Sequence, residues 1–207
     1  MKVKRSQVGW GFWLQWLLAS TVGYFVGWLM GFVLTVGWVE TISGVSRLYQ
    51  YFMLGAALGF GVSLMQWLVL RRRVSKAGWW VLASTASFAV VGGGGYGAAS
   101  VVFGFSEGME GFLSSADLLG WTVIVALGGA VTGTLQWLIL RGQVSRAGWW
   151  VLASTVGWGL SMAVVGAITV VAAGEGSLFD MLPGGAVLGA VTGGALVWLL
   201  RQPVPEV

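Results

Sequence analysis

The sequence predicts an all-α integral membrane protein with six transmembrane helices. Of its 207 residues, 57% are hydrophobic and only 9% are charged, whereas a soluble domain carries about 25% charged residues. The charged residues form short groups that separate six long apolar runs. Each run reaches the ~20 residues that a helix needs to cross the hydrocarbon core of a bilayer. A transmembrane β-barrel would show short segments of alternating hydrophobicity instead, so we expect helices.

The expected helices occupy the runs between charged groups, at residues 8–39, 48–70, 77–106, 118–140, 147–174 and 181–200. The even-numbered runs are close to the minimum length. The odd-numbered runs are longer, so we expect those helices to tilt, to bend or to project beyond the bilayer. The four glycines at 92–95 predict a bend in the third helix. The first run exceeds the ~7–15-residue core of a signal peptide, so we interpret it as a mature membrane segment.

The charges predict the orientation of the helices. Arg47 shares one side with the acidic residues, and Glu206 lies with the basic group on the other side. An excess of Lys and Arg marks the cytoplasmic side, so both termini are expected in the cytoplasm. The basic residues on that side are Lys2, Lys4, Arg5, Arg71, Arg72, Arg73, Lys76, Arg141, Arg146 and Arg201, and the acidic residues opposite are Glu40, Glu107, Glu110, Asp117, Glu175 and Asp180.

One phrase occurs twice in the chain. "VSKAGWWVLAST" at 74–85 and "VSRAGWWVLAST" at 144–155 agree at eleven of twelve positions, and "LAST" recurs at 18–21. This alignment makes Trp16, Trp80 and Trp150 equivalent. The even-numbered runs also match, since "MQWLVLRRRV" at 65–74 resembles "LQWLILRGQV" at 135–144, and "GAVTGTLQWLILR" at 129–141 aligns without gaps to "GAVTGGALVWLLR" at 189–201.

Self-similarity of this kind predicts one structural unit stacked on copies of itself. We expect a single membrane domain over 1–207, built from three like-oriented helical hairpins at about 8–70, 77–140 and 147–200. Such hairpins can close into a pseudo-threefold bundle around an axis along the membrane normal. Parallel repeats of this sort occur in transporters, although the symmetry alone does not identify a carrier.

The pattern QWLxLR–VSxAGWW–LAST resembles uncharacterised Trp-rich and Gly-rich multi-pass membrane proteins of bacteria, photosynthetic bacteria among them. The resemblance covers most of the chain and brings no activity with it. It implies an integral protein of a bacterial cytoplasmic membrane or of an intracytoplasmic, thylakoid-type membrane.

Glycines at every fourth position predict close helix packing. Spacing of four places them on one helix face, where the missing side chain lets another backbone approach. We expect these glycines to pack helices within the chain, and the alternative is docking of a partner helix or a lipid. The residues are Gly23, Gly27, Gly31, Gly55, Gly59, Gly129, Gly133, Gly185, Gly189 and Gly193.

Most tryptophans cluster near the expected cytoplasmic boundary, as in an interfacial aromatic belt. A sharper hypothesis is an aromatic cage formed by Trp16, Trp80 and Trp150, which would hold a lipid tail, a pigment ring or an organic cation. Adjacent Trp residues point ~100° apart on a helix, so each pair can place one ring inward and one outward.

The polar residues within the expected spans suggest hydrogen bonds between helices. Gln66 and Gln136 can each bond to another helix or to water, or alternatively contact a substrate or a pigment. Gln15 is a third amide, but it aligns with Trp79. The hydroxyls of Ser84, Thr85, Ser154 and Thr155 are expected to bond to carbonyls of their own helices.

The composition also excludes several kinds of site. The chain has no Cys and no His, so thiol chemistry and the commonest general base are absent. No ionisable residue lies within an expected span, although coupled transporters usually need one. Glu107, Glu110 and Asp117 could bind a hard cation, but a solvated acidic loop is the simpler interpretation. We therefore expect no catalytic residue, no metal site and no nucleic-acid partner, since the basic residues form no soluble basic face.

These observations favour a non-enzymatic membrane protein. Our leading hypothesis is an accessory or scaffolding subunit that packs against lipids and other membrane proteins, in a larger complex or a homo-oligomer. It requires no cofactor, and bound lipid or a pigment is compatible with its composition. The alternative is a passive pore or uncoupled carrier for a small neutral or apolar solute. A bundle axis filled by side chains favours the scaffold, and an open axis favours the pore.

Overall fold

The computed structural model describes residues 8–39, 47–103, 115–172 and 178–202. All regular structure in these segments is helical. A short 3₁₀ helix, η2, leads into the last helix. The elements are α1 (Trp10–Val39), α2 (Arg47–Leu70), α3 (Gly78–Phe103), α4 (Ser115–Leu140), α5 (Trp149–Val171), η2 (Leu178–Asp180) and α6 (Met181–Arg201).

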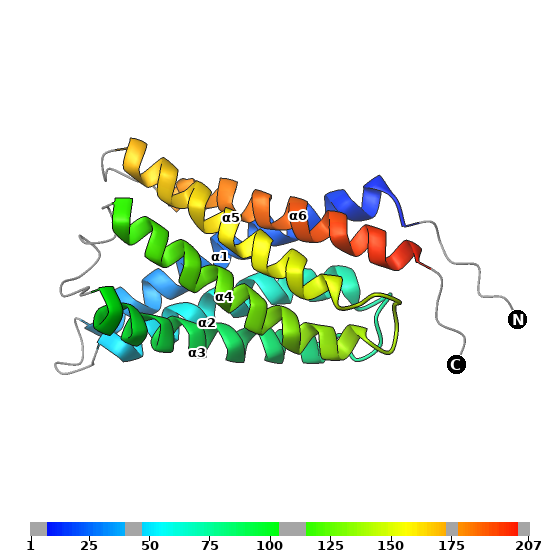
Figure 1. Cartoon of the computed structure of the whole chain (residues 1–207), viewed down its shortest axis with the longest axis horizontal. Coiled ribbons are helices and arrows are strands. Elements are labelled where there is room, and N and C mark those ends of the chain that lie inside the picture. Colours follow the sequence, from blue (N-terminus) through cyan, green and yellow to red (C-terminus); the bar gives the residue numbers. More distant parts are fainter. Residues whose placement is uncertain (1–7, 40–46, 104–114, 173–177, 203–207) are drawn as a thin grey trace, which may run out of the picture.

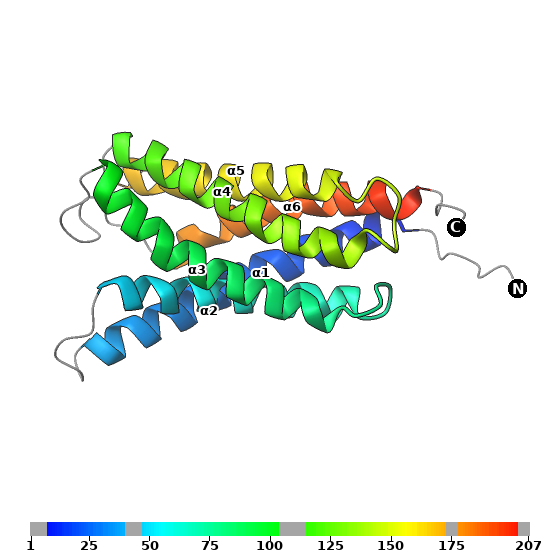
Figure 2. The same cartoon turned by 60° about the horizontal axis from the view of Figure 1, so that its bottom comes forward.

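The six helices form a closed ring in which each helix packs against its two neighbours. Consecutive helices contact one another, and α1 contacts α6. All six run along the long axis of the molecule (Figures 1 and 2). The turns that join α2 to α3 and α4 to α5 lie at the same end as the beginning of α1 and the end of α6 (Figure 1). There Arg201 donates from Nε to the Val8 carbonyl over 2.8 Å, so α6 and α1 are also joined at this end.

Among the described side chains, the basic residues gather at this end of the bundle, called here the basic end. Asp180 lies at the other end, at the beginning of α6. The side chains of Arg47 and Asp117, which also belong to the expected separation of basic from acidic residues, lie outside the described part of the chain. The described basic side chains at the basic end are Arg71, Arg72, Arg73, Lys76, Arg141, Arg146 and Arg201.

Five of the helices, α1, α2, α4, α5 and α6, are long and apolar enough to cross a membrane within their described residues. α3 is not among them. We attribute this difference to three hydroxyl side chains and the four glycines at 92–95, which lower the hydropathy of its described part. Much of the outer surface of the bundle is apolar, with Leu14, Leu18, Val90 and Leu119 among the exposed side chains.

The lengths of the helices do not follow the lengths of the apolar runs closely. α3 and α4 each have 26 residues, whereas α5 has 23 and α2 has 24. α4 begins at Ser115, ahead of its apolar run, because acidic and polar residues are favourable in the first turn of a helix. α5 ends at Val171, where the backbone N–H of Ala172 bonds to the Ile168 carbonyl over 2.8 Å. Charged residues thus locate the apolar segments well but the helix ends poorly.

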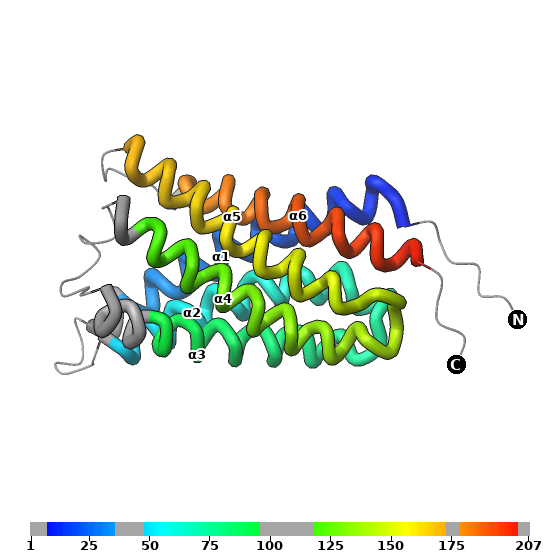
Figure 3. The backbone as a smooth tube through the Cα atoms, in the orientation of Figure 1, coloured from blue at the N-terminus to red at the C-terminus, as the bar shows by residue number. Residues whose placement is uncertain are grey.

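The four glycines at 92–95 do not interrupt α3, which continues as an α-helix through them (Figure 3). Gly92, Gly93 and Gly95 pack against neighbouring helices, whereas Gly94 faces open space. A Cβ atom on Gly92 would lie 3.2 Å from the Cα atom of Gly55, and one on Gly95 would lie 2.6 Å from the side chain of Ile124. A helix interior tolerates glycine at a cost of ~1 kcal/mol per residue, which the close approach of α2 and α4 offsets here.

Candidate functional site

Three tryptophans from the odd-numbered helices meet inside the bundle near its basic end. Trp16 of α1 lies 6.1 Å from Trp80 of α3 and 6.1 Å from Trp150 of α5, measured between ring centroids, with both pairs edge-to-face. Trp80 and Trp150 are 5.3 Å apart. Aromatic rings favour this range and these tilted arrangements. We call these three residues the tryptophan cluster.

The tryptophan cluster encloses no ligand-sized space, because its rings fill the centre themselves. All three side chains are fully buried, and they share one apolar core with Leu70, Leu140, Leu196 and Leu199. The neighbouring residues Trp79 and Trp149 are 62% and 56% exposed. Each tryptophan pair therefore places one ring inward and one outward, as the ~100° rotation between adjacent helical residues predicts.

Two members of the cluster each donate their indole N–H to a glutamine. Trp80 donates from Nε1 to Gln66 Oε1 over 3.1 Å, and Trp150 donates in the same way to Gln136 over 2.8 Å. Both acceptors lie in the preceding even-numbered helix. These bonds matter because a buried indole N–H without a partner costs about 1–3 kcal/mol.

The amide nitrogens of the same glutamines reach a third helix. Gln66 Nε2 donates to Ser20 of α1 over 3.1 Å, and Gln136 Nε2 donates to Ser84 of α3 over 2.8 Å. The Ser84 hydroxyl in turn donates a hydrogen bond to the Trp80 carbonyl over 2.8 Å. Each glutamine thus joins three helices through one buried amide.

The third tryptophan uses a different acceptor. Trp16 donates to Thr192 Oγ1 of α6 over 2.9 Å, and that hydroxyl donates to the Leu188 carbonyl over 2.6 Å. In the ungapped alignment of 129–141 with 189–201, Leu196 stands where α4 has Gln136. Leu196 is fully buried. A hydroxyl one helical turn away therefore replaces the missing amide.

A second aromatic layer lies deeper in the bundle. Trp158 of α5 contacts Phe88 of α3 with centroids 4.1 Å apart, and Tyr24 of α1 at 5.8 Å, and both ring pairs are tilted. A buried hydrogen bond of 2.7 Å between Ser87 and Thr132 joins α3 to α4 at this depth. The axis of the bundle is therefore occupied by side chains at two successive levels.

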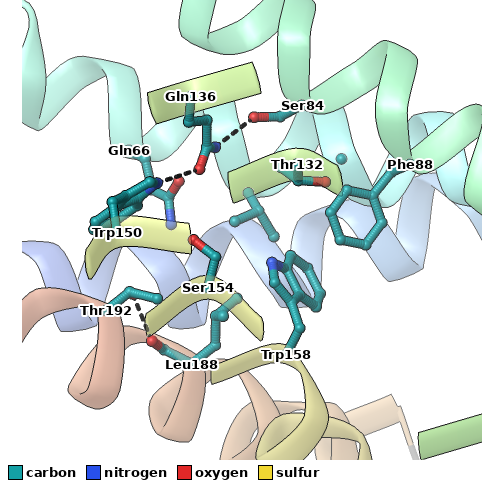
Figure 4. A pocket seen from close by; sticks show the side chains of 12 residues that line it. Gln66, Ser84, Phe88, Thr132, Gln136, Trp150, Ser154, Trp158, Leu188 and Thr192 are labelled. Atoms are coloured by element: carbon teal, nitrogen blue, oxygen red, sulfur yellow. Dashed lines mark hydrogen bonds between the residues drawn. The ribbon is translucent and has the colours of Figure 1, made fainter. Parts of the chain in front are cut away.

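A small cavity with a mixed polar and apolar lining separates the two layers (Figure 4). Its volume is about 10 Å³, and a cavity needs roughly 10–15 Å³ to hold one water molecule. The space therefore accommodates about one water and no organic ligand. Its lining is Gly59, Val62, Gln66, Ser84, Phe88, Thr132, Gln136, Trp150, Ser154, Trp158, Leu188 and Thr192.

Three aligned glycines of the even-numbered helices, Gly59, Gly129 and Gly189, lie against the next odd-numbered helix in the ring. A Cβ on Gly59 would lie 2.7 Å from the Ser84 carbonyl oxygen, and one on Gly129 would lie 2.7 Å from that of Ser154. The aligned Gly189 of α6 would meet the Leu17 carbonyl oxygen at 2.9 Å and the Cβ of Ser20 at 3.0 Å. Gly59 and Gly129 thus make the same contact with aligned serines, and Gly189 makes a comparably close approach to Leu17 and Ser20 of α1.

The other glycines of the predicted packing stripes also lie against helices of this chain. Gly23 and Gly27 face α2, where a Cβ would come within 2.6 and 2.8 Å of backbone atoms. Gly31 faces Leu54 of the same helix. The remaining members of the stripes, Gly55, Gly133, Gly185 and Gly193, face Phe88, Ser154, Thr21 and Trp16, respectively.

Other predicted polar residues are divided between the interior and the surface. Ser84 and Thr155 bond to carbonyls of their own helices over 2.8 Å, which confirms the expectation for these two. It is wrong for Thr85, whose buried hydroxyl has no hydrogen-bond partner among the described residues. Gln15 is exposed on α1 and does not join the other two glutamines.

The possible cation ligands Glu107 and Glu110 lie outside the described residues, as does the side chain of Asp117. Within the described part of the chain, no group of three His, Cys, Asp or Glu side chains could hold a metal ion.

Ser20 is not among the hydrogen-bond partners expected from the sequence, although its spacing from Trp16 could have indicated it as a partner of a glutamine. Ser20, Ser84 and Ser154 each follow a cluster tryptophan by four residues. Residues four apart share one helix face, so a serine four positions beyond an inward-facing tryptophan also faces inward. The serine of each "LAST" phrase is therefore the interior member of that phrase.

Comparisons with known proteins give no relative from which a role could be transferred: no family model, no curated protein and no solved structure matches this chain.

Proposed function

We propose that this chain is a non-enzymatic, multi-pass membrane protein that serves as an accessory or scaffolding subunit. In this proposal all six helices span the membrane as three like-oriented hairpins around a pseudo-threefold axis. The membrane is a bacterial cytoplasmic or thylakoid-type membrane, and the basic end faces the cytoplasm, in accordance with the positive-inside rule.

The observation that carries the proposal is the filled axis. A pore needs a continuous wet path, but the tryptophan cluster and the Trp158–Phe88 layer occupy the centre at two levels. The cavity between them holds about one water. The buried polar groups there bond to one another through Gln66 and Gln136. Such an interior stabilises one arrangement of helices, which is what a scaffold requires.

Recurring contacts support the three-hairpin arrangement. Gly59 and Gly129 make the same contact with aligned serines, and the aligned Gly189 lies comparably close to α1. α6 contacts α1 as α2 contacts α3. The hydrogen bond from Arg201 to Val8 joins the helices where the chain has no covalent turn.

The outer surface supports a role in packing against lipids and membrane proteins. Large apolar side chains such as Leu82, Leu127 and Val171 are more than half exposed. Surfaces of this kind are stable only against lipid tails or against other apolar helices. Trp10, Trp79 and Trp149 are exposed at the basic end, at the level where indoles favour the headgroup region of a bilayer.

The test is purification from native membranes in a mild detergent, followed by size determination and identification of co-purifying chains. We expect the protein in an assembly larger than its 21.8 kDa monomer. Recovery only as a free monomer would overturn the proposal. An absorption spectrum of the same preparation tests for a bound pigment.

Flux of a small neutral solute in proteoliposomes tests the alternative of a passive pore or uncoupled carrier. We expect no flux above that of empty liposomes. Measurable flux that is lost in Gln66→Leu with Gln136→Leu would support the alternative path along the small cavity and contradict the scaffold.

A further inference from the structure

An outward-facing groove of about 710 Å³ lies between α1 and α2 near the basic end. α1 contributes Gln15, Leu18 and Ala19, and α2 contributes Met65, Leu68 and Val69. The three arginines at 71–73 line its mouth, just beyond the last residue of α2. The groove is therefore apolar along its length and cationic at one end. This arrangement complements a phospholipid with apolar acyl chains and an anionic headgroup.

A second groove at the aligned place in the ring lacks this division. It lies between α5 and α6, has about 370 Å³, and its lining includes no charged residue. Trp149 stands there where α1 has Gln15, and Trp198 stands where α2 has Leu68. These two indoles contact each other edge-to-face at 6.3 Å across the groove. Replacement of both by smaller residues leaves the α1/α2 groove larger and open.

The two turns at the basic end, α2–α3 and α4–α5, also differ in charge. The α2–α3 turn has three consecutive arginines at 71–73, whereas the aligned positions of the α4–α5 turn are Arg141, Gly142 and Gln143. The α4–α5 turn therefore carries two basic residues, Arg141 and Arg146, whereas the α2–α3 turn carries four. The two additional arginines occur at the turn that borders the larger groove.

Aromatic contacts hold two of these arginines on opposite sides of the groove mouth. The guanidinium of Arg71 lies 5.4 Å from the ring centroid of Trp67 on α2, and that of Arg73 lies 5.1 Å from that of Phe12 on α1. A guanidinium stacked by its face on a ring can still direct in-plane N–H groups at a phosphate. Arg72 is exposed between them.

We propose that the α1/α2 groove binds one anionic phospholipid, with its phosphate among the three arginines at 71–73 and one acyl chain along Leu18, Met65 and Leu68. The inference rests on the proposed membrane role, because only a chain inserted in a bilayer presents this groove to lipid. It adds the class of lipid and its site. Gln15 lines the same groove and offers an amide to the glycerol ester region of the lipid.

The experiment is native mass spectrometry of the detergent-purified protein with palmitoyl-oleoyl phosphatidylglycerol or with the phosphatidylcholine that carries the same chains. We expect one retained phosphatidylglycerol and a clear preference for it. The variant Arg72→Gly with Arg73→Gln gives this turn the residues of its aligned counterpart. It should lower the preference by about tenfold to thirtyfold, since each arginine near an anionic headgroup contributes roughly a fivefold effect.

Two further variants make the result specific. Arg141→Gln with Arg146→Gln removes the same charge from the same end and should keep the preference. Gln15→Trp with Leu68→Trp rebuilds the tryptophan pair of the α5/α6 groove, keeps every arginine, and should lose the bound lipid. Unfolding temperatures of all variants establish that each is folded.

The outcomes separate this site from general attraction to charge. Equal losses in the two arginine variants, absence of any preference in the unaltered protein, or full displacement by soluble glycerol phosphate would each overturn the lipid site. The scaffold proposal is tested separately, by recovery in a larger assembly. A protein found in such an assembly but without lipid preference would therefore refute only the site.

Discussion

Trp150 donates its indole N–H to Gln136 Oε1 across 2.8 Å, and neither side chain reaches the surface. The bond joins α5 to α4 at the level where three helices converge. Both polar atoms of the Gln136 amide are hydrogen-bonded, because its oxygen accepts from Trp150 and its nitrogen donates to Ser84 of α3. A single side chain thus fixes the distances among three helices.

Replacing Gln136 by Leu should destabilise the bundle. The change leaves the buried Trp150 N–H and Ser84 hydroxyl without this partner, at a cost of about 1–2 kcal/mol. In a chain of this size, that corresponds to a fall of roughly 2–8 °C in the unfolding temperature, measurable by thermal denaturation in detergent.

The companion variant is Trp150→Phe, which removes the donor. If the hydrogen bond carries the effect, Gln136→Leu should cost less in the Trp150→Phe background than in the unaltered protein. Additive losses in this double-mutant cycle would show that the amide and the indole act independently, contrary to our interpretation.

Gly129→Ala should be strongly destabilising, because its new Cβ would lie 2.7 Å from the Ser154 carbonyl oxygen. This oxygen belongs to the backbone of α5, which cannot move aside without separating α4 from α5. The matched control is Gly94→Ala, where nothing lies within 4 Å of the added atom. There we expect no loss, or a gain of up to about 1 kcal/mol from helix propensity. Comparable destabilisation of both variants, measured by thermal denaturation, would refute the packing role.

The turns of the basic end contain two residues in the left-handed region. Lys76 has φ of 60° and Arg146, at the aligned position, has φ of 58°. This conformation costs a residue other than glycine roughly 1–2 kcal/mol. Lys76→Gly should therefore raise the unfolding temperature by a few degrees. Arg72→Gly removes the same charge from the same turn, where φ is not positive, and should give no gain.

Much of the architecture is predictable from the sequence because the physics there is local. Apolar runs between charges predict the helices, and the 100° rotation per residue makes Trp79 and Trp80 face opposite ways. Every-fourth glycines such as Gly55 and Gly59 indicate tight helix contacts before any partner helix is known.

The interior could not be predicted in the same way. Whether inward-facing tryptophans enclose a ligand or touch each other depends on the distance between helices, and backbone contacts such as that of Gly59 with Ser84 set this distance. Similarly, the alignment identifies Leu196 as the counterpart of Gln136 but does not identify Thr192 as the substitute acceptor. That assignment requires knowledge of which side chains share a level in the bundle.

The tryptophan pair at 79–80 allows the sharpest comparison, because two identical residues adjacent in sequence have opposite environments. Trp80 is fully buried in the tryptophan cluster and donates to Gln66, whereas Trp79 is 62% exposed on the outer surface. Trp80→Ala removes a core ring and leaves a cavity, which costs about 3–5 kcal/mol. Trp79→Ala removes only a surface contact and should change stability in detergent by less than about 1 kcal/mol.

Membrane insertion should show the reverse order. An exposed indole at the basic end lies at the level where the headgroup region favours it, so Trp79→Ala should weaken anchoring while leaving the detergent-solubilised fold intact. Thermal denaturation in detergent and extraction from membranes by alkaline wash measure the two effects separately. Equal loss of stability in both variants would contradict the inward and outward assignment of the pair, and with it the filled axis on which the scaffold proposal depends.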